Sequence, residues 1–339
     1  MNRICNFLIL SIIIYSNSYS QSIAAKIVDV EGQPIQGVKV FYDNSSIITY
    51  TNDKGIFEIQ ALPELYDPLL IFYHPQYELF LEPDPNNISN SSSYRLKKRS
   101  ADLSDSSQRS SVYSSDKPFN EFRKYFIGKG INAESTRILN HEQIILEYNE
   151  SENIISAKAN KPLQIVNDAL GYEIEFFLEQ FEVRYFSRAY KEKYLDLAFF
   201  SGYSSFKELD STKTIERHNA LQTNFNYFFK QIIKENFDDI LAEVKINGEK
   251  TKPKKIFRRK NTSDGLYKLE FDEPIVSGAQ DKFSYVLELT FEDQKVKLQV
   301  YNNFLLVNNE GHIMSEDHLD ITKTDRALSN RIPIDYKDF

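Results

Sequence analysis

Alternating apolar and polar residues dominate the first hundred positions of the chain. One alternating run covers residues 25–30, and another places apolar side chains at every second position from 38 to 42. A period of two is typical of a β-strand with one buried face. The sequences Glu31-Gly32-Gln33-Pro34 and Asn52-Asp53-Lys54-Gly55 separate such runs, because Gly, Asn and Asp tolerate the backbone conformations of tight turns. About seven short strands at this spacing predict a small antiparallel β-sandwich.

The region from residue 119 onwards is also predicted to be mostly β. Strand-like runs occupy residues 143–148, 153–159, 172–186, 242–246, 267–271, 285–291 and 296–300. The exception is Thr212 to Lys234, where the apolar residues form one stripe at helical spacing. We therefore predict a mainly β protein, in which a seven-stranded, prealbumin-like sandwich precedes a larger β-rich α+β domain with one long helix.

Residues 1–20 have the layout of a secretory signal peptide. Arg3 provides a cationic head, the apolar run 7–15 follows, and the small residues Ser18 and Ser20 precede the expected cut before Gln21. The apolar run is shorter than the roughly 20 residues that a membrane span requires. The signal interpretation predicts an exported protein, and an uncleaved N-terminal anchor is the alternative.

Composition divides the rest of the chain. Residues 99–118 predict a linker, because seven serines lie between Ser104 and Ser115 among few apolar residues. The predicted units are thus a sandwich at 21–98 and a second domain at 119–339. Cys5, the only cysteine, lies inside the signal, so the mature chain is predicted to lack disulfides and cysteine-linked lipid. We also expect no transmembrane segment in the mature chain, since no other apolar run is long enough.

The distribution of charge is uneven. Asp and Glu (49) outnumber Lys and Arg (41), and the net charge of −8 argues against a nucleic-acid partner. Seven cations nevertheless gather within eleven residues, namely Lys250, Lys252, Lys254, Lys255, Arg258, Arg259 and Lys260. Such a patch is a candidate site for an anionic ligand, either a phosphorylated envelope glycolipid or an acidic partner. The alternative is a solvated hairpin whose charges keep an exposed strand edge from aggregating.

Candidate catalytic groups are sparse. None of the five histidines has a second His at the spacing of a zinc-peptidase helix. The nearest approach to a metal cluster is His312 and His318 with Glu316 and Asp317, for which a solvated loop is the simpler interpretation. No Ser lies in a Gly-x-Ser-x-Gly sequence, and the mature chain offers no Cys nucleophile. We expect no enzymatic activity, no cofactor and no metal.

One segment is crowded with aromatic residues. Its rings are Tyr185, Phe186, Tyr190, Tyr194, Phe199, Phe200, Tyr203 and Phe206. Aromatic residues in strands usually pack in a core, whereas exposed rings in a groove are typical of sugar-binding surfaces. We favour the core, and a glycan-binding surface is the alternative.

Several motifs of the first unit resemble one known family. They are Ile27-Val28-Asp29, Gly32-Gln33-Pro34-Ile35-Gln36-Gly37-Val38-Lys39-Val40, Thr51-Asn52-Asp53-Lys54-Gly55-Ile56-Phe57 and His74-Pro75-Gln76-Tyr77. This succession is similar to the carboxypeptidase-regulatory-like, prealbumin-type domain that is common in envelope proteins of Bacteroidetes. Gln76 stands where that family often has Gly. The resemblance implies a β-sandwich, and the residues themselves do not support carboxypeptidase activity.

A second resemblance covers the region that follows. Its motifs are Phe126-Ile127-Gly128, Asn132-Ala133, Arg137-Ile138-Leu139-Asn140, residues 156–167, residues 169–174 and Ile332-Pro333-Ile334-Asp335-Tyr336. They are similar to the uncharacterised region that follows this sandwich in many such envelope proteins. Ser135 replaces a frequent Cys and Tyr227 a frequent His, so a role that depends on either of those residues cannot operate here.

The two resemblances together imply a secreted or periplasmic two-domain protein, and they imply no reaction. Because Gln21 and not a cysteine follows the signal, we expect an exported, periplasmic or outer-membrane-associated protein that is not a lipoprotein. We predict a non-catalytic envelope module for interaction or assembly. Its expected partner is another envelope protein, or an envelope glycan or lipid. A glycan-binding accessory protein is the first alternative, and an unrecognised hydrolase is the second.

Overall fold

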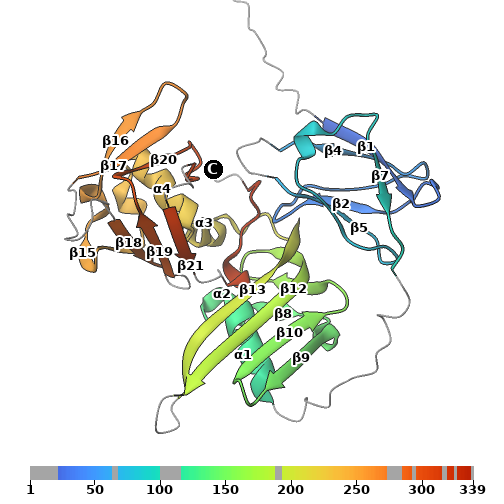
Figure 1. Ribbon diagram of the computed structural model, residues 1–339, viewed down its shortest axis with the longest axis horizontal. Helices are drawn as coiled ribbons and strands as arrows, with labels where there is room; N and C mark the ends of the chain where they lie inside the picture. Colours follow the sequence, from blue (N-terminus) through green and yellow to red (C-terminus); the bar gives the residue numbers. More distant parts are fainter. Residues whose placement is uncertain are drawn as a thin grey trace, which may run out of the picture.

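The computed structural model describes residues 22–62, 68–99, 116–187, 193–272, 285–291, 295–314, 319–323 and 327–336. It confirms the predicted mainly β fold, because most of the described elements are strands of antiparallel sheets (Figure 1). The expected signal peptide at 1–20 and residues 100–115 of the expected linker lie outside the described residues.

The first unit, which we call the sandwich, consists of two sheets that share one core. Its elements are β1 (Ser22–Asp29), β2 (Lys39–Tyr42), β3 (Ile48–Tyr50), β4 (Ile56–Gln60), β5 (Leu70–Tyr73), β6 (Phe80–Glu82), η2 (Pro85–Asn87) and β7 (Ser93–Leu96). One sheet has the order β4-β1-β7 and the other β3-β2-β5-β6. Alternate residues such as Ile27, Val40 and Phe72 are fully buried between them. The turn predicted at 52–55 joins β3 to β4, with the Asn52 side chain accepting two backbone N–H groups.

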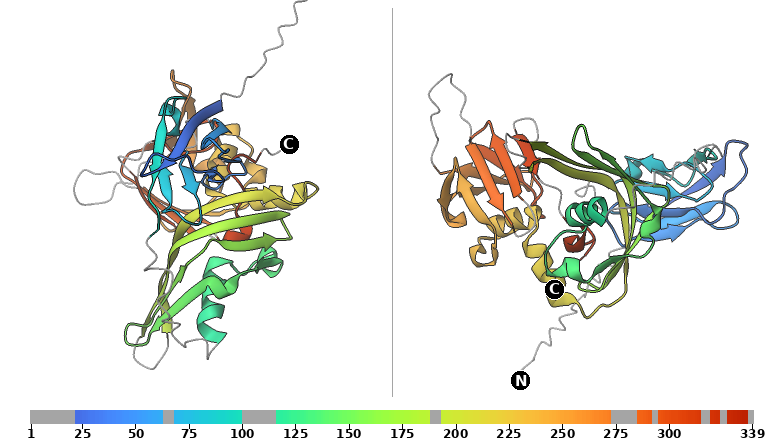
Figure 2. Two further views of the ribbon diagram at one scale, coloured as in Figure 1. Left: turned by 90° about the vertical axis from the view of Figure 1, so that its right-hand side faces the viewer. Right: turned by 90° about the horizontal axis from the view of Figure 1, so that it is seen from below.

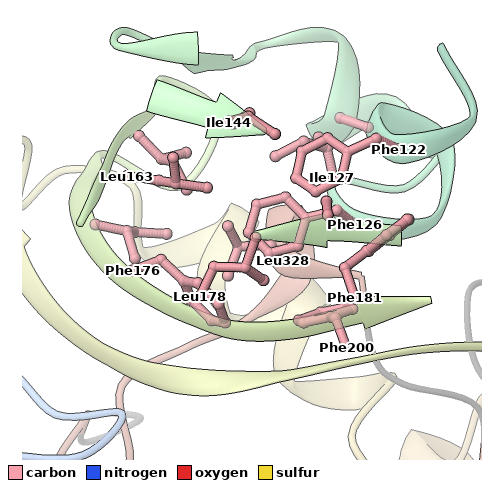
Figure 3. Packing of buried hydrophobic residues seen from close by; sticks show 14 of the residues in the cluster. Phe122, Phe126, Ile127, Ile144, Leu163, Phe176, Leu178, Phe181, Phe200 and Leu328 are labelled. Carbon is pink, nitrogen blue, oxygen red and sulfur yellow. The ribbon is translucent and has the colours of Figure 1, made fainter. Parts of the chain in front are cut away.

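The central unit is a curved sheet with a helix on one face. Its elements are α1 (Asp116–Phe126), α2 (Ile131–Glu134), β8 (Thr136–Ile138), η5 (His141–Gln143), β9 (Ile144–Asn149), β10 (Ile154–Ala159), β11 (Leu163–Asn167), β12 (Tyr172–Ser187) and β13 (Lys193–Glu208). The long strand β12 pairs with β11 and β10 along one edge and with β13 along the other. Phe122 and Phe126 of α1 pack against Phe176, Phe181 and the other rings of the sheet (Figure 3). Burying each such ring contributes about 1.5–3 kcal/mol.

The prediction of one long helix over Thr212–Lys234 is wrong. The structure has two helices instead, α3 (Thr214–Gln222) and α4 (Phe225–Lys234). Asn224 between them has an extended backbone (φ −88°, ψ 138°), and its side chain accepts the N–H of Asn226 at 2.8 Å. This bond satisfies a donor that the first turn of a helix leaves without a partner, so Asn224 starts a new helix.

The C-terminal unit packs two further sheets against α4. Its other elements are η6 (Phe237–Asp239), β14 (Glu243–Ile246), β15 (Glu249–Thr251), η7 (Pro253–Lys255), β16 (Phe257–Asn261), β17 (Tyr267–Phe271), β18 (Tyr285–Thr290), β19 (Lys295–Val300), β20 (Phe304–Val307) and β21 (Leu319–Lys323). The sheets have the orders β15-β14-β18-β19-β21 and β16-β17-β20. Phe228, Phe229 and Ile232 of α4 belong to the core of this unit, which is separate from the core of the central unit. Region 119–339 thus contains two cores among its described residues.

A turn of the sandwich, residues 43–46, lies against strand β13 of the central unit. The N–H of Asn44 donates to the carbonyl of Ser204 at 2.7 Å, and the N–H of Phe206 donates to the carbonyl of Ser45 at 2.8 Å. Ser45 and Ser205 form a parallel bridge. The sandwich therefore contacts an edge of the central sheet through this turn, in which Asn44 has a left-handed backbone (φ +54°).

Residues 327–336, which we call the strap, tie this junction to the central core. Leu328 of η9 (Leu328–Asn330) is fully buried in that core, and η9 lies beside α1 and α2 (Figure 2). Further along, the N–H of Ile334 donates to the carbonyl of Asn44 at 2.8 Å, and Asp335 accepts the backbone N–H of Ser46 at 2.7 Å. The turn 43–46 is thus held between β13 on one side and the strap on the other.

Candidate functional site

All seven cations of the candidate anionic-ligand patch lie in the C-terminal unit. Lys250 belongs to β15, Lys252 follows that strand, and Lys254 and Lys255 belong to η7, while the remaining three lie on β16. All seven side chains are exposed. The structure therefore places the patch on the edge strands of two different sheets and on the turn that joins them.

Four of these cations are paired with acidic side chains from other segments. Lys250 lies 2.9 Å from Glu243, Arg258 2.8 Å from Asp272, Arg259 3.5 Å from Glu235 and Lys260 2.6 Å from Glu270. Hydrogen bonds from the partner lysines lower the pKa of both Glu243 and Glu270. Four of the seven cations thus have an acidic partner, as expected for a solvated hairpin, and Glu243 and Glu270 each pair with a further lysine as well, Lys245 and Lys268 respectively.

The other three cations, Lys252, Lys254 and Lys255, form what we call the lysine tip. Within the described part of the chain, none of the three has an ion pair. The tip is well anchored, because Pro253 starts η7, the N–H of Lys255 donates to the carbonyl of Lys252 at 2.9 Å, and the adjacent Ile256 is buried. Three ammonium groups are thus presented to solvent from one short turn, an arrangement that attracts anionic groups.

The aromatic segment is mostly packed. Phe200 and Phe206 are buried in the central core, and Tyr185 donates its hydroxyl hydrogen to Glu121 of α1. Tyr203 packs with Phe177 and residues of the sandwich. Among the described rings of the segment, Phe186 is the one with an exposed side chain, whereas Tyr190 and the side chain of Tyr194 lie outside the described residues. The core interpretation is therefore confirmed for Phe200 and Phe206.

The structure gathers no metal site from the residues that it describes. No group of three or more His, Cys, Asp or Glu side chains in the described ranges is placed to hold a metal ion. His312 is half-buried in a turn against α4, where its backbone N–H donates to the Asn308 side chain, and burial lowers its pKa. The other members of the candidate cluster, residues 316–318, lie outside the described ranges.

One buried cation, Arg217 of α3, was not among the candidate site residues, although it matches the helix of the family that this region resembles. Its guanidinium donates to the carbonyls of Leu170 at 2.9 Å and Asp210 at 2.6 Å and pairs with Glu208. It also lies 4.1 Å from the centre of the Tyr172 ring. These contacts satisfy the guanidinium from several sides, so Arg217 fixes the turns that flank β12 and β13 and is not available to a ligand.

A second set of buried charges fixes the junction between the sandwich and the central unit. Lys39 pairs with Glu175 and donates to the Ser205 hydroxyl at 2.7 Å. Asp43 accepts the backbone N–H of Ser204 at 2.7 Å, and burial raises its pKa. Lys39 also lies over the Phe41 ring, which stacks on Phe177 of the central unit, so these contacts help to orient the two units relative to each other.

No helix in the described part of the chain is both long enough and apolar enough to cross a membrane. Comparisons with protein-family models, with curated proteins and with solved structures found no match.

Proposed function

We propose that this protein is a non-catalytic interaction module of the cell envelope and that it contacts an anionic envelope lipid through the lysine tip. The observation that carries the proposal is the charge pattern of the patch. Lys252, Lys254 and Lys255 are exposed and have no ion pair among the described residues, whereas the neighbouring cations of the same run are paired with carboxylates.

The expected cellular location of the protein supports the same proposal. The signal-like residues 1–20 and the resemblance to envelope proteins of Bacteroidetes both point to an exported protein, in a compartment bounded by phosphate-bearing lipids. On a chain with a net charge of −8, a local group of free lysines also orients the molecule, because the rest of an acidic surface is repelled by an anionic membrane. Each lysine close to such a surface contributes about 1 kcal/mol of attraction.

The glycan-binding and hydrolase alternatives make different demands. The first needs exposed rings along a groove, and the described rings of the aromatic segment lie mostly in the core. The second needs a catalytic cluster, and the described residues contain no group of three or more His, Cys, Asp or Glu placed to hold a metal ion. The lysine tip is therefore the feature on which we base a function.

Vesicle co-sedimentation tests the proposal. The triple variant Lys252→Ser/Lys254→Ser/Lys255→Ser is compared with wild type on phosphatidylcholine vesicles with and without phosphatidylglycerol. The matched control Lys26→Ser/Lys54→Ser/Lys98→Ser removes three exposed lysines from the sandwich and changes the net charge equally. Wild type and control should bind anionic vesicles at low salt, and the tip variant should bind roughly a hundredfold more weakly, the equivalent of about 1 kcal/mol per lysine.

The salt dependence of vesicle binding is a second test of the proposal. High salt screens such contacts, so the binding of wild type should disappear as the Debye length shortens to a few ångströms. Equal binding by all three proteins, or binding by wild type that ignores salt, would exclude the lysine tip as the site.

A further inference from the structure

The inference concerns how the sandwich is held on the central unit. Where the two units touch directly, the buried apolar contact centres on Phe41 and Ile71 of the sandwich and Phe177 of β12. The rings of Phe41 and Phe177 are stacked, with their centres 5.5 Å apart. Apart from this contact, the sandwich and the central unit each have a core of their own. The two units can therefore separate without the unfolding of either one.

Polar groups weaken this direct contact. Docking buries the pair of Lys39 and Glu175 and the carboxylate of Asp43, and a buried ion pair adds little net stability because its groups lose their hydration. Two buried oxygen atoms at the junction, Asn44 Oδ1 and Ser204 Oγ, have no hydrogen-bond partner among the described residues. Each of them opposes docking, since water would bond to it in the separated units. The direct contact is therefore weak on its own.

The second half of the strap contains a turn, residues 333–336, that contacts both units and that we call the latch. The N–H of Tyr336 donates to the carbonyl of Pro333 at 3.0 Å and closes the turn. The side chain of Ile334, at the corner of the turn, packs against the core of the sandwich. The side chain of Tyr336 packs against the core of the central unit. The latch thus joins the two units next to their weak direct contact.

The two halves of the strap differ in burial. Residues 327–330 are all buried, and the Asn167 side chain donates to the carbonyl of Ser329 at 2.8 Å. Residues 334–336 are only half-buried. Half-buried segments open more readily than segments inside a core. Helix η9 is therefore the fixed part of the strap, and the latch is the part that can open.

We propose that the latch opens reversibly and that its opening releases the sandwich from the central sheet with both cores intact. The turn 43–46 lies between β13 and the latch, so the contacts across the junction break together. Release uncovers Phe41 and Phe177, an apolar surface that the closed form hides. The latch is separate from the lysine tip, so this proposal does not depend on the function proposed above.

Hydrogen exchange on the wild-type chain tests the proposal without any variant. The amides of Asn44, Phe206 and Ile334 each donate across the junction. If the junction opens as one unit, these three amides share one protection factor. That factor should be at least about tenfold below the factor of the Ile27 amide, which is bonded inside the sandwich. Three different factors, or protection equal to that of Ile27, would overturn the proposal.

A variant of the latch provides the second test. The variant Ile334→Ser/Asp335→Ala removes the apolar contact with the sandwich and the carboxylate that accepts the N–H of Ser46. The control Ile313→Ser/Asp272→Ala makes the same substitutions at two half-buried residues of the C-terminal unit. X-ray scattering should show a larger radius of gyration for the latch variant, and the control should match wild type.

The exchange rates of the latch variant distinguish undocking from unfolding. The amides of Asn44 and Phe206 should exchange roughly tenfold faster than in wild type or more, because hydrogen bonds to charged groups contribute at least that much. The amide of Ile27 should keep its rate. Unchanged rates at Asn44 and Phe206 overturn the proposal. An equal acceleration at Ile27 overturns it as well, because the sandwich then unfolds rather than undocks.

Discussion

The close packing of one turn against α4 leads to a prediction with an internal control. Gly311 has φ +87°, and a Cβ at this position would overlap the carbonyl oxygen of Asn226 and lie 2.7 Å from the N atom of Lys230. Gly248 in the same unit has the same φ of +87°, but a Cβ there would meet nothing within 4 Å. The two glycines therefore share the conformational requirement and differ only in the space around them.

The expected magnitudes follow from that difference. An alanine in the left-handed region costs about 1–2 kcal/mol at either position. At Gly311 the backbone of α4 must also move, and forcing extra volume into a packed site costs a further 1–3 kcal/mol or so. We expect Gly248→Ala to lose about 1–2 kcal/mol of unfolding free energy and Gly311→Ala about 2–5 kcal/mol.

Urea unfolding provides the measurement. The chain has 21 Tyr and no Trp, so tyrosine fluorescence and far-ultraviolet circular dichroism are the suitable signals. The midpoint should fall for both variants, with the slope unchanged and the larger fall for Gly311→Ala. Equal losses for the two variants would refute the reasoning, because they would mean that the turn at 308–312 does not rest on α4 in solution.

Two further predictions concern the junction. Leu328→Ala should lower the free energy of unfolding by about 2–5 kcal/mol, because Leu328 is fully buried in the central core. The control Ile215→Ala changes a residue that is 72% exposed and should alter it by less than about 0.5 kcal/mol, and the urea midpoints of the two variants provide the comparison. Burial raises the pKa of Asp43 in the folded protein above its pKa in the unfolded chain. The free energy of unfolding of the wild type therefore increases as the pH falls from above the folded-state pKa to the unfolded-state pKa. Asp43→Asn should therefore have a larger free energy of unfolding than wild type at pH 7, and this difference should shrink as the pH approaches about 4. Urea unfolding curves at several pH values measure the difference. A difference that stays the same at every pH would refute the reasoning.

The sequence predicted those parts of the fold that depend on neighbouring residues. The alternation in residues 25–42 and the turn at 52–55 are local signals, and both appear in the sandwich as strands and a side-chain-stabilised turn. The break at Asn224 was missed because the apolar stripe continues through it, although an Asn before an apolar run is also a start signal for a helix. Periodicity reports that a face is buried, and it does not report which core buries it.

The candidate site was predictable only in part, for a related reason. The clustering of seven cations is visible in the sequence, but the carboxylates that neutralise four of them come from positions 235, 243, 270 and 272. The pairing of β14 with β15 and of β16 with β17 brings three of those acids close, and Glu235 comes from the end of α4.

The strap has a consequence for the timing of folding. The turn at 43–46 leaves the ribosome long before residue 334, which later donates a hydrogen bond to it. At 5–20 residues per second, the interval is roughly 15 to 60 s. During that time the sandwich can complete its own core, but the turn has at most one of its two neighbours. The final seating of the sandwich on the central sheet therefore belongs to the last stage of biogenesis, after nearly the whole chain has been made.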